Sequence, residues 1–418
     1  MQTRGLDWRT ILLALIDLLG ALVALGLAAL LAIYSVLRGA SGADTQDGPT
    51  AFQIILLASA LAMMSAGFIP ATYYNIRRMF EKNIPNPTPK PLHIWQGFML
   101  ITAWVFSAIL AQILFNSQSL KWLSPPFYLL AVILPGYFLL HLASGGLNIG
   151  SRLRTWSTLS VGMTLGPLLS FMAELALIIL GLVGIGIYLA LHPGQTSAFQ
   201  QFADKLRNAP SLDELAATAG PWVISPLTFF GALLFFSVFT PFIEETAKSL
   251  TVWLMFSRLA SPAQGFIAGA LSGAGFGLLE SLLVSASPDS SWSTTLLVRG
   301  MSTMMHILAS SLAGWGIASY RLSKRPGRMI GMYALAISLH SLWNASVVTI
   351  VFGGLALTLN NTKPTDLIGL AMIAFGILVL VILSLGIPIS MGIFNQVLKS
   401  KEPSSLPLAD AINPEGVK

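Results

Sequence analysis

Six polar side chains interrupt long apolar segments in the second half of the chain. They are Glu244, Glu245, Glu280, His306, His340 and Asn344. A carboxylate and an imidazole that lie together can act as general base and general acid towards water. A histidine and an asparagine one helical turn apart can donate hydrogen bonds to a developing oxyanion. These residue types therefore indicate chemistry of the kind that hydrolyses an amide bond.

The same side chains could also hold a metal ion. Catalytic zinc sites use imidazole nitrogens and carboxylate oxygens and leave one position for water. The chain has no cysteine, which excludes thiolate ligands and disulfide bonds. If a metal is bound, zinc is the expected ion, and the expected ligands are Glu245, Glu280, His306 and His340. The residues alone leave open whether a glutamate or a metal activates the water.

Spacing places these candidates on helix faces, because residues four apart lie on the same face. The pairs at this spacing are Glu244 with Lys248, Phe276 with Glu280, His306 with Ser310, and His340 with Asn344. Placing an ionisable side chain at the bilayer centre costs about 2.5–3.5 kcal/mol of insertion free energy. Each ionisable residue within an apolar segment is therefore a candidate for function. Asp17 and Glu174 also interrupt apolar segments, but no motif surrounds them. We expect Glu174 to be a buried acid without a catalytic role.

The composition predicts an all-α fold, a polytopic membrane helix bundle. Of the 418 residues, 55% are hydrophobic and 10% are charged, whereas soluble domains carry roughly 25% charged residues. A helix needs about 20 mostly apolar residues to cross a bilayer, and we expect about ten transmembrane helices. The qualifying segments are 10–37, 51–75, 93–115, 124–148, 160–191, 222–256, 263–286, 293–320, 329–356 and 366–394.

Small residues lie beside the candidates on two of these segments. They are Gly269, Gly273, Gly275 and Gly277 on one, and Ala309, Ser310, Ala313 and Gly314 on the next. Small side chains let membrane helices approach closely. We therefore expect the two helices to pack tightly and to bring their polar residues into one site.

A polar stretch from about 192 to 221 divides the chain into two halves. We expect an N-terminal bundle of about five transmembrane helices over 1–192, a core over 222–356 that carries all six candidates, and a last transmembrane helix over 366–394. The polar tail over 400–418 is expected to be disordered. The segment 222–256 is too long for one straight span, and Pro241 is the expected break.

The basic residues predict the orientation of the bundle. Lysine and arginine are enriched in cytoplasmic loops, and an N-terminus inside the cell places most of the 23 basic residues on that side. Both termini are therefore expected in the cytoplasm. The net charge of +6 does not indicate nucleic-acid binding, because the positive charges lie in short loops between apolar runs.

The ordered motifs resemble those of the PrsW family of intramembrane proteases, relatives of the CAAX-processing and bacteriocin-processing proteases. The motifs are Glu-Glu-x-x-Lys at 244–248, Phe-x-x-x-Glu at 276–280, the isolated His306, and His-x-x-x-Asn at 340–344. The resemblance covers roughly 222–350 and makes 222–356 a protease-like core. It implies an intramembrane endopeptidase, glutamate- or metal-dependent, in a bacterial plasma membrane. Its substrate would be a membrane protein such as an anti-sigma factor.

The resemblance also assigns roles to individual residues. Glu244 matches the glutamate that activates water, and Glu245 is its neighbour. His340 and Asn344 match the pair that stabilises the oxyanion. The wider superfamily often has histidine at the position of Glu280, which leaves Glu280 or His306 to polarise the water.

Two other classes of protein fit the same residues. A proton-coupled secondary transporter uses intramembrane glutamates and histidines as proton relays, although the first five segments carry no copy of the polar motifs. A non-catalytic scaffold could keep the protease fold and lose the activity. The presence of all the motif residues argues against the scaffold.

Overall fold

The computed structural model describes residues 8–41, 49–80, 88–209, 211–359 and 363–401. Within these ranges the regular structure is helical throughout. The α-helices are α1 Trp8–Ala40, α2 Ala51–Phe80, α3 Ile94–Phe115, α4 Pro125–Ser144, α5 Arg152–Leu191, α6 Pro193–Arg207, α7 Leu212–Val223, α8 Pro226–Leu234, α9 Thr240–Leu254, α10 Pro262–Val284, α11 Trp292–Ser323, α12 Pro326–Leu359 and α13 Lys363–Lys399. Short turns of 3-10 helix lie at Lys121–Leu123 and Phe256–Arg258.

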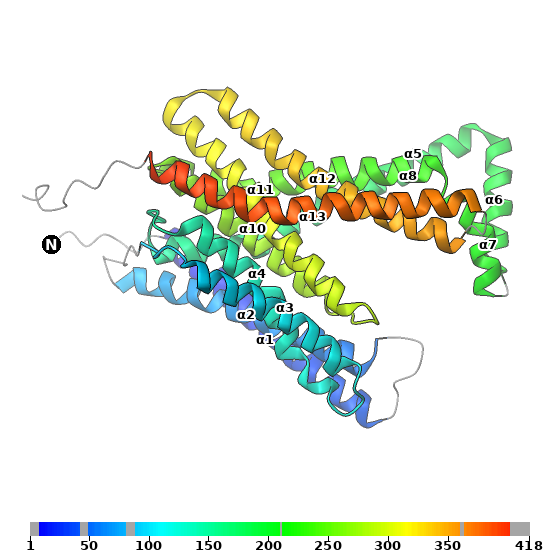
Figure 1. The fold of residues 1–418 in the computed structure, drawn as a ribbon, viewed down its shortest axis with the longest axis horizontal. Helices are drawn as coiled ribbons and strands as arrows, with labels where there is room; N and C mark the ends of the chain where they lie inside the picture. The colour runs from blue at the N-terminus through cyan, green and yellow to red at the C-terminus, as the bar shows by residue number, and fades with distance from the viewer. Residues whose placement is uncertain (1–7, 42–48, 81–87, 210, 360–362, 402–418) are drawn as a thin grey trace, which may run out of the picture.

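Ten helical segments of the described chain are long and apolar enough to cross a membrane. This confirms the all-α, polytopic fold class. Helix α13 ends at the same end of the molecule at which α1 begins, while α6 and α7 lie at the opposite end (Figure 1). From the first end, α1–α4 diverge from the group formed by α5, α8, α12 and α13. The polar stretch at 192–221 is thus largely two short helices, and most of the predicted tail lies outside the described residues.

The span that carries the two adjacent glutamates contains the expected break, slightly earlier than Pro241. A π-helical segment, Phe235–Phe239, separates α8 from α9. Pro241 lies in the first turn of α9, directly after the π-helical segment. Proline cannot donate to the carbonyl of the preceding turn, and wider π-type turns occur where that ladder is interrupted. The break places the glutamates just inside a new helix.

Helix α10 lies between α11 and α5 and contacts both through glycine. A Cβ atom at Gly269 would overlap the carbonyl oxygen of Ser310, and one at Gly273 would overlap that of His306. On the other side, a Cβ at Gly275 would lie 2.7 Å from the backbone nitrogen of Met163 on α5. The close packing expected from the small residues is therefore confirmed. This packing fixes the position of α11, including His306, along the axis of α10.

The first helices pack against the same core. The hydroxyl of Tyr128 on α4 donates to the carbonyl oxygen of Leu282 on α10. Trp104 on α3 lies against Gly300 on α11, and one buried apolar cluster joins residues of α2, α3, α4, α10, α11, α12 and α13. Packing is thus continuous across the division expected at 192–221. That division remains a proposal about function.

The α10–α11 contact predicts the effect of enlarging one glycine. Gly269→Ala should lower the free energy of unfolding by about 1–3 kcal/mol, the usual effect of overpacking, because its Cβ would meet the backbone at Ser310. The thermal unfolding temperature should fall accordingly. Gly331→Ala on α12 is the control, since a Cβ there meets nothing within 4 Å. Circular dichroism in detergent measures both. Equal unfolding temperatures for the two variants would contradict the close approach.

Candidate active site

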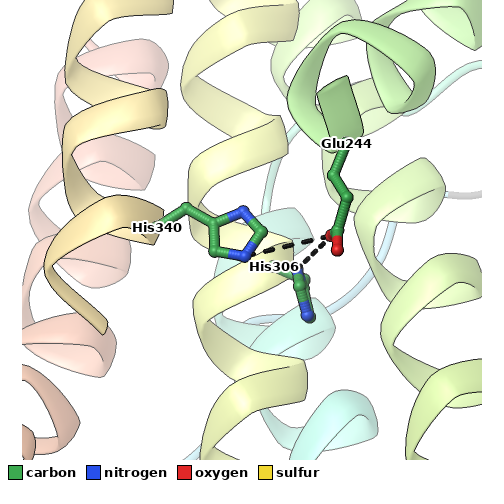
Figure 2. A group of neighbouring side chains, drawn as sticks. All are labelled: Glu244, His306 and His340. Carbon is green, nitrogen blue, oxygen red and sulfur yellow. Dashed lines mark ion pairs between the residues drawn. The ribbon is translucent and has the colours of Figure 1, made fainter. Parts of the chain in front are cut away.

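Three neighbouring helices each contribute to one buried group of polar side chains. Helix α9 presents Glu244, Glu245 and Lys248 on one face, while α11 and α12 present His306 and His340. Figure 2 shows the Glu244 carboxylate directed at the two imidazoles from a separate helix. All five residues are at most 8% exposed. Charged and polar groups this deeply buried need specific partners.

Each histidine uses one ring nitrogen to contact a carboxylate. Nδ1 of His340 lies 3.0 Å from Oε1 of Glu245, and Nε2 of His306 lies 2.9 Å from Oε2 of Glu280 on α10. A carboxylate accepts, so these ring nitrogens donate, and in a neutral imidazole the opposite nitrogen carries a lone pair. The two lone pairs are then on Nε2 of His340 and Nδ1 of His306.

Both lone pairs face Glu244. Its Oε2 lies 3.9 Å from Nδ1 of His306 and 3.9 Å from Nε2 of His340 (Figure 2). One ligand atom from each of the three residues lies within 4.8 Å of the others. The donor set of two imidazoles and one carboxylate is that of a catalytic zinc site, and the carboxylate behind each imidazole is the usual outer partner of a metal-binding histidine. The residues therefore fit a metal ion.

This arrangement redistributes the expected metal ligands. His306 and His340 belong to the converging group, and the third member is Glu244. Glu245 instead accepts from His340 and, through Oε2, from the hydroxyl of Ser310 at 3.1 Å. Glu280 pairs with His306 and with Arg299 at 2.8 Å. Both glutamates are thus positioned behind the histidines.

Lys248 supplies the positive charge of the group. Its Nζ lies 2.9 Å from Oε2 of Glu244, 2.8 Å from Oε1 of Glu245 and 2.7 Å from Nδ1 of His306. The ammonium also lies 4.1 Å from the ring centre of Phe276, a cation–π contact. The side chain is fully buried. Lys248 thereby links α9 to α11 and compensates the two adjacent carboxylates.

Asn344 lies apart from the charged group. Its Nδ2 donates to the carbonyl oxygen of Phe236 in the π-helical segment, at 2.8 Å. The contact joins α12 to the break between α8 and α9. An amide carries a second N–H, so the oxyanion role remains a proposal for this residue.

Arg299 belongs to the site, and Glu174 lies within electrostatic range of it, although the motifs predicted neither. Arg299 ties Glu280 to α11, and its only sequence signal was a charged residue at the edge of a span. Glu174 on α5, expected to have no role, interacts electrostatically with Glu244, Glu280 and Lys248. Its buried Oε1 has no hydrogen-bond partner among the described residues. The packing of α5 on α10 brings it there, which spacing along the chain cannot reveal.

The fold and site define an integral membrane protein with a buried Glu-His-His centre. The sequence model of the PrsW family, described as "PrsW family intramembrane metalloprotease", matches residues 211–386. The match contains the whole converging group, so this part of the chain is similar to that family. No curated protein and no solved structure matches the chain.

The buried charges predict the effect of removing the ammonium. Lys248→Met should destabilise the protein by about 3–5 kcal/mol, because it leaves the carboxylates of Glu244 and Glu245 buried without their partner. Thermal unfolding in detergent measures the loss. Adding Glu245→Gln to the variant should recover part of it.

The control for this change is Lys205→Met on α6, an exposed lysine whose replacement should leave the unfolding temperature unchanged. If Lys248→Met were as stable as the wild type, the two glutamates could not both be ionised in the folded protein. The charge-compensating role of Lys248 would then be abandoned.

Proposed function

We propose that this protein is an intramembrane metalloprotease that hydrolyses a peptide bond in a membrane-associated protein. One observation carries the proposal: Glu244, His306 and His340 converge from three helices, and each imidazole is held from behind by a carboxylate. The match to a family of intramembrane metalloproteases supports the same conclusion.

Glu244, His306 and His340 would hold the metal, and zinc is the proposed ion because it takes imidazole and carboxylate ligands. Bound there, it would lower the pKa of a water molecule and polarise the scissile carbonyl. Glu244 is the carboxylate of the centre that makes no hydrogen bond within 3.5 Å to a described histidine. Its Oε2 faces the two histidines and would bind the ion, and we assign its other carboxylate oxygen the role of accepting the proton of the attacking water.

The other residues position and balance this centre. Glu245 and Glu280 fix the ring orientation and the tautomer of His340 and His306. A separate group must stabilise the oxyanion, because both histidines face Glu244. We propose Asn344 for this role, with the amide N–H that Phe236 does not use.

The helix bundle explains how water can be controlled at the site. Glu245 and Lys248 have no exposed side-chain surface, whereas the Glu280 side chain is 34% exposed. The centre is therefore open on the side of Glu280 and closed behind α9. Exclusion of bulk water strengthens each electrostatic interaction within the centre.

Several expectations are carried into the proposal. The family resemblance implies a membrane-protein substrate such as an anti-sigma factor and a location in the plasma membrane, and the distribution of basic residues predicts both termini in the cytoplasm. Residues 222–356 form the protease core, 366–394 provide the last transmembrane helix, and 1–192 form a bundle whose role is open.

Cleavage assays test the proposed activity. Purified wild-type protein in detergent should cleave at least one of a panel of single-span membrane substrates, and a chelator should abolish the cleavage. Glu244→Gln and His340→Ala should abolish it as well, and Asn344→Ala should lower kcat by about 10²–10³-fold. Glu214→Gln, an exposed glutamate on α7, is the control and should remain active.

Two results would count against the protease. Cleavage that survives Glu244→Gln would remove the central residue from the mechanism. An absence of cleavage for every substrate, together with proton flux in liposomes that depends on Glu280 and Glu174, would favour the transporter.

Metal binding gives a test that does not depend on a substrate. The wild type should copurify with about one equivalent of zinc, measured by elemental analysis. His306→Ala and His340→Ala should lose it. Glu245→Gln and Glu280→Gln should retain the site with metal affinity lowered about 10–100-fold, because only the outer partners of the histidines change. If both His306→Ala and His340→Ala kept the metal, the ion would have to bind elsewhere.

A further inference from the structure

A second site lies at the other end of α9, away from the Glu-His-His centre. A pocket of about 780 Å³ is formed where the start of α1, the end of α2, the start of α5 and the end of α9 meet. All four belong to helices that could cross a membrane, and the pocket lies near their ends. The pocket is therefore at the depth where lipid headgroups meet protein.

Three arginines line this pocket. Arg78 comes from α2, Arg154 from α5, and Arg258 from the turn after α9. None of the lining residues is acidic. Asp17 on α1 is already hydrogen-bonded, since Ser160 donates to its Oδ1 and Asn75, a lining residue, donates to its Oδ2 at 3.0 Å. Arg154 and Arg258 thus give the pocket positive charge, and its described lining residues include no carboxylate.

Two of the arginines lie close enough to repel each other. Arg154 interacts electrostatically with Arg258, and its Nη2 donates to the carbonyl oxygen of Arg258 at 3.3 Å. Its Nη1 donates to Oε1 of Gln264 at 2.7 Å, which orients the guanidinium. Holding two like charges together costs free energy unless an anion lies between them. A phosphate group suits this position, because guanidinium binds its oxygens in pairs.

The rest of the wall is suited to hydrocarbon. Leu13, Leu153, Val161, Leu254 and Met255 line the pocket beside the arginines. Leu13 and Leu254 are exposed on the outer surface of the helices. An acyl chain could therefore run from the pocket along the surface that faces the membrane.

We propose that this pocket binds one anionic phospholipid, with the phosphate between Arg154 and Arg258 and the chains along the leucines. Basic pockets between transmembrane helices are typical binding sites for anionic headgroups. Inorganic phosphate would satisfy the arginines but not the apolar wall. An acidic peptide would leave the same wall uncovered. The lipid accounts for both parts of the pocket.

The pocket also contacts the helix that carries the candidate active site. Thr251 on α9 lines it. The hydroxyl of Ser272 donates to the carbonyl oxygen of Lys248 at 2.8 Å and lies 3.1 Å from Oγ1 of Thr251. A bound lipid would thus rest on the last turns of the helix that holds Glu244, yet the lipid proposal does not depend on the proposed protease activity.

Native mass spectrometry of the full chain in detergent tests the proposal. With dioleoyl phosphatidylglycerol added, the wild type should retain one lipid at least about tenfold more tightly than dioleoyl phosphatidylcholine. The double variant Arg154→Gln, Arg258→Gln should lose this preference. Leu13→Trp should also weaken binding, because an indole on an exposed position would fill the pocket without changing its charge.

The matched control is Arg325→Gln with Arg328→Gln, which removes the same charge from two exposed residues at the junction of α11 and α12. It should keep the preference. Thermal unfolding shows whether the Arg154 and Arg258 variant is folded, and Leu13→Trp decides the question if it is not.

Three outcomes would overturn the proposal. Equal retention of the two lipids would mean that charge is not recognised. An equal loss in the control variant would mean that overall charge, and no built site, attracts the lipid. Complete displacement of phosphatidylglycerol by millimolar inorganic phosphate would make this a site for free anions.

Discussion

The candidate active site depends on the burial of a single ammonium group. Lys248 has no exposed surface, and a buried charge is stable only when its partners compensate for the lost hydration. Glu244 and Glu245 provide two charges from the same helix, and His306 provides a lone pair from α11. Helices α9 and α11 must therefore remain within hydrogen-bond distance. The carboxylate–imidazole pairs extend this network to α10 and α12.

Close helix packing makes that network possible. Small residues at an interface let membrane helices approach closely, which brings polar side chains of neighbouring helices within hydrogen-bond distance. Glycines of α10 allow its backbone to contact α11 on one side and α5 on the other. The π-helical segment lies directly before α9, the helix that carries the two adjacent glutamates. The small residues of α10 thus allow charged groups from separate helices to come together.

Much of this could be read from the sequence, although the grouping could not. Polar residues in apolar segments gave all the members of the site on α9, α10, α11 and α12 except Arg299, because insertion of such residues into a membrane is costly. Which carboxylate faces both histidines depends on helix rotation and height, and sequence spacing does not fix either. For this reason Glu244, expected to activate water, is the carboxylate that faces the two histidines, while Glu245, an expected ligand, lies behind His340. Glu174 was set aside because its partners lie on other helices.

The sequence by itself determined the all-α membrane class, the number of candidate spans and the residue types able to do chemistry, since these follow from local hydropathy and from the cost of burying charge. Only the tertiary structure decided which atoms meet. The convergence of Glu244 with His306 and His340, and the basic pocket at Arg154 and Arg258, arise where helices far apart in sequence cross. Such crossings depend on the complementary packing of whole helix surfaces, which no single segment encodes.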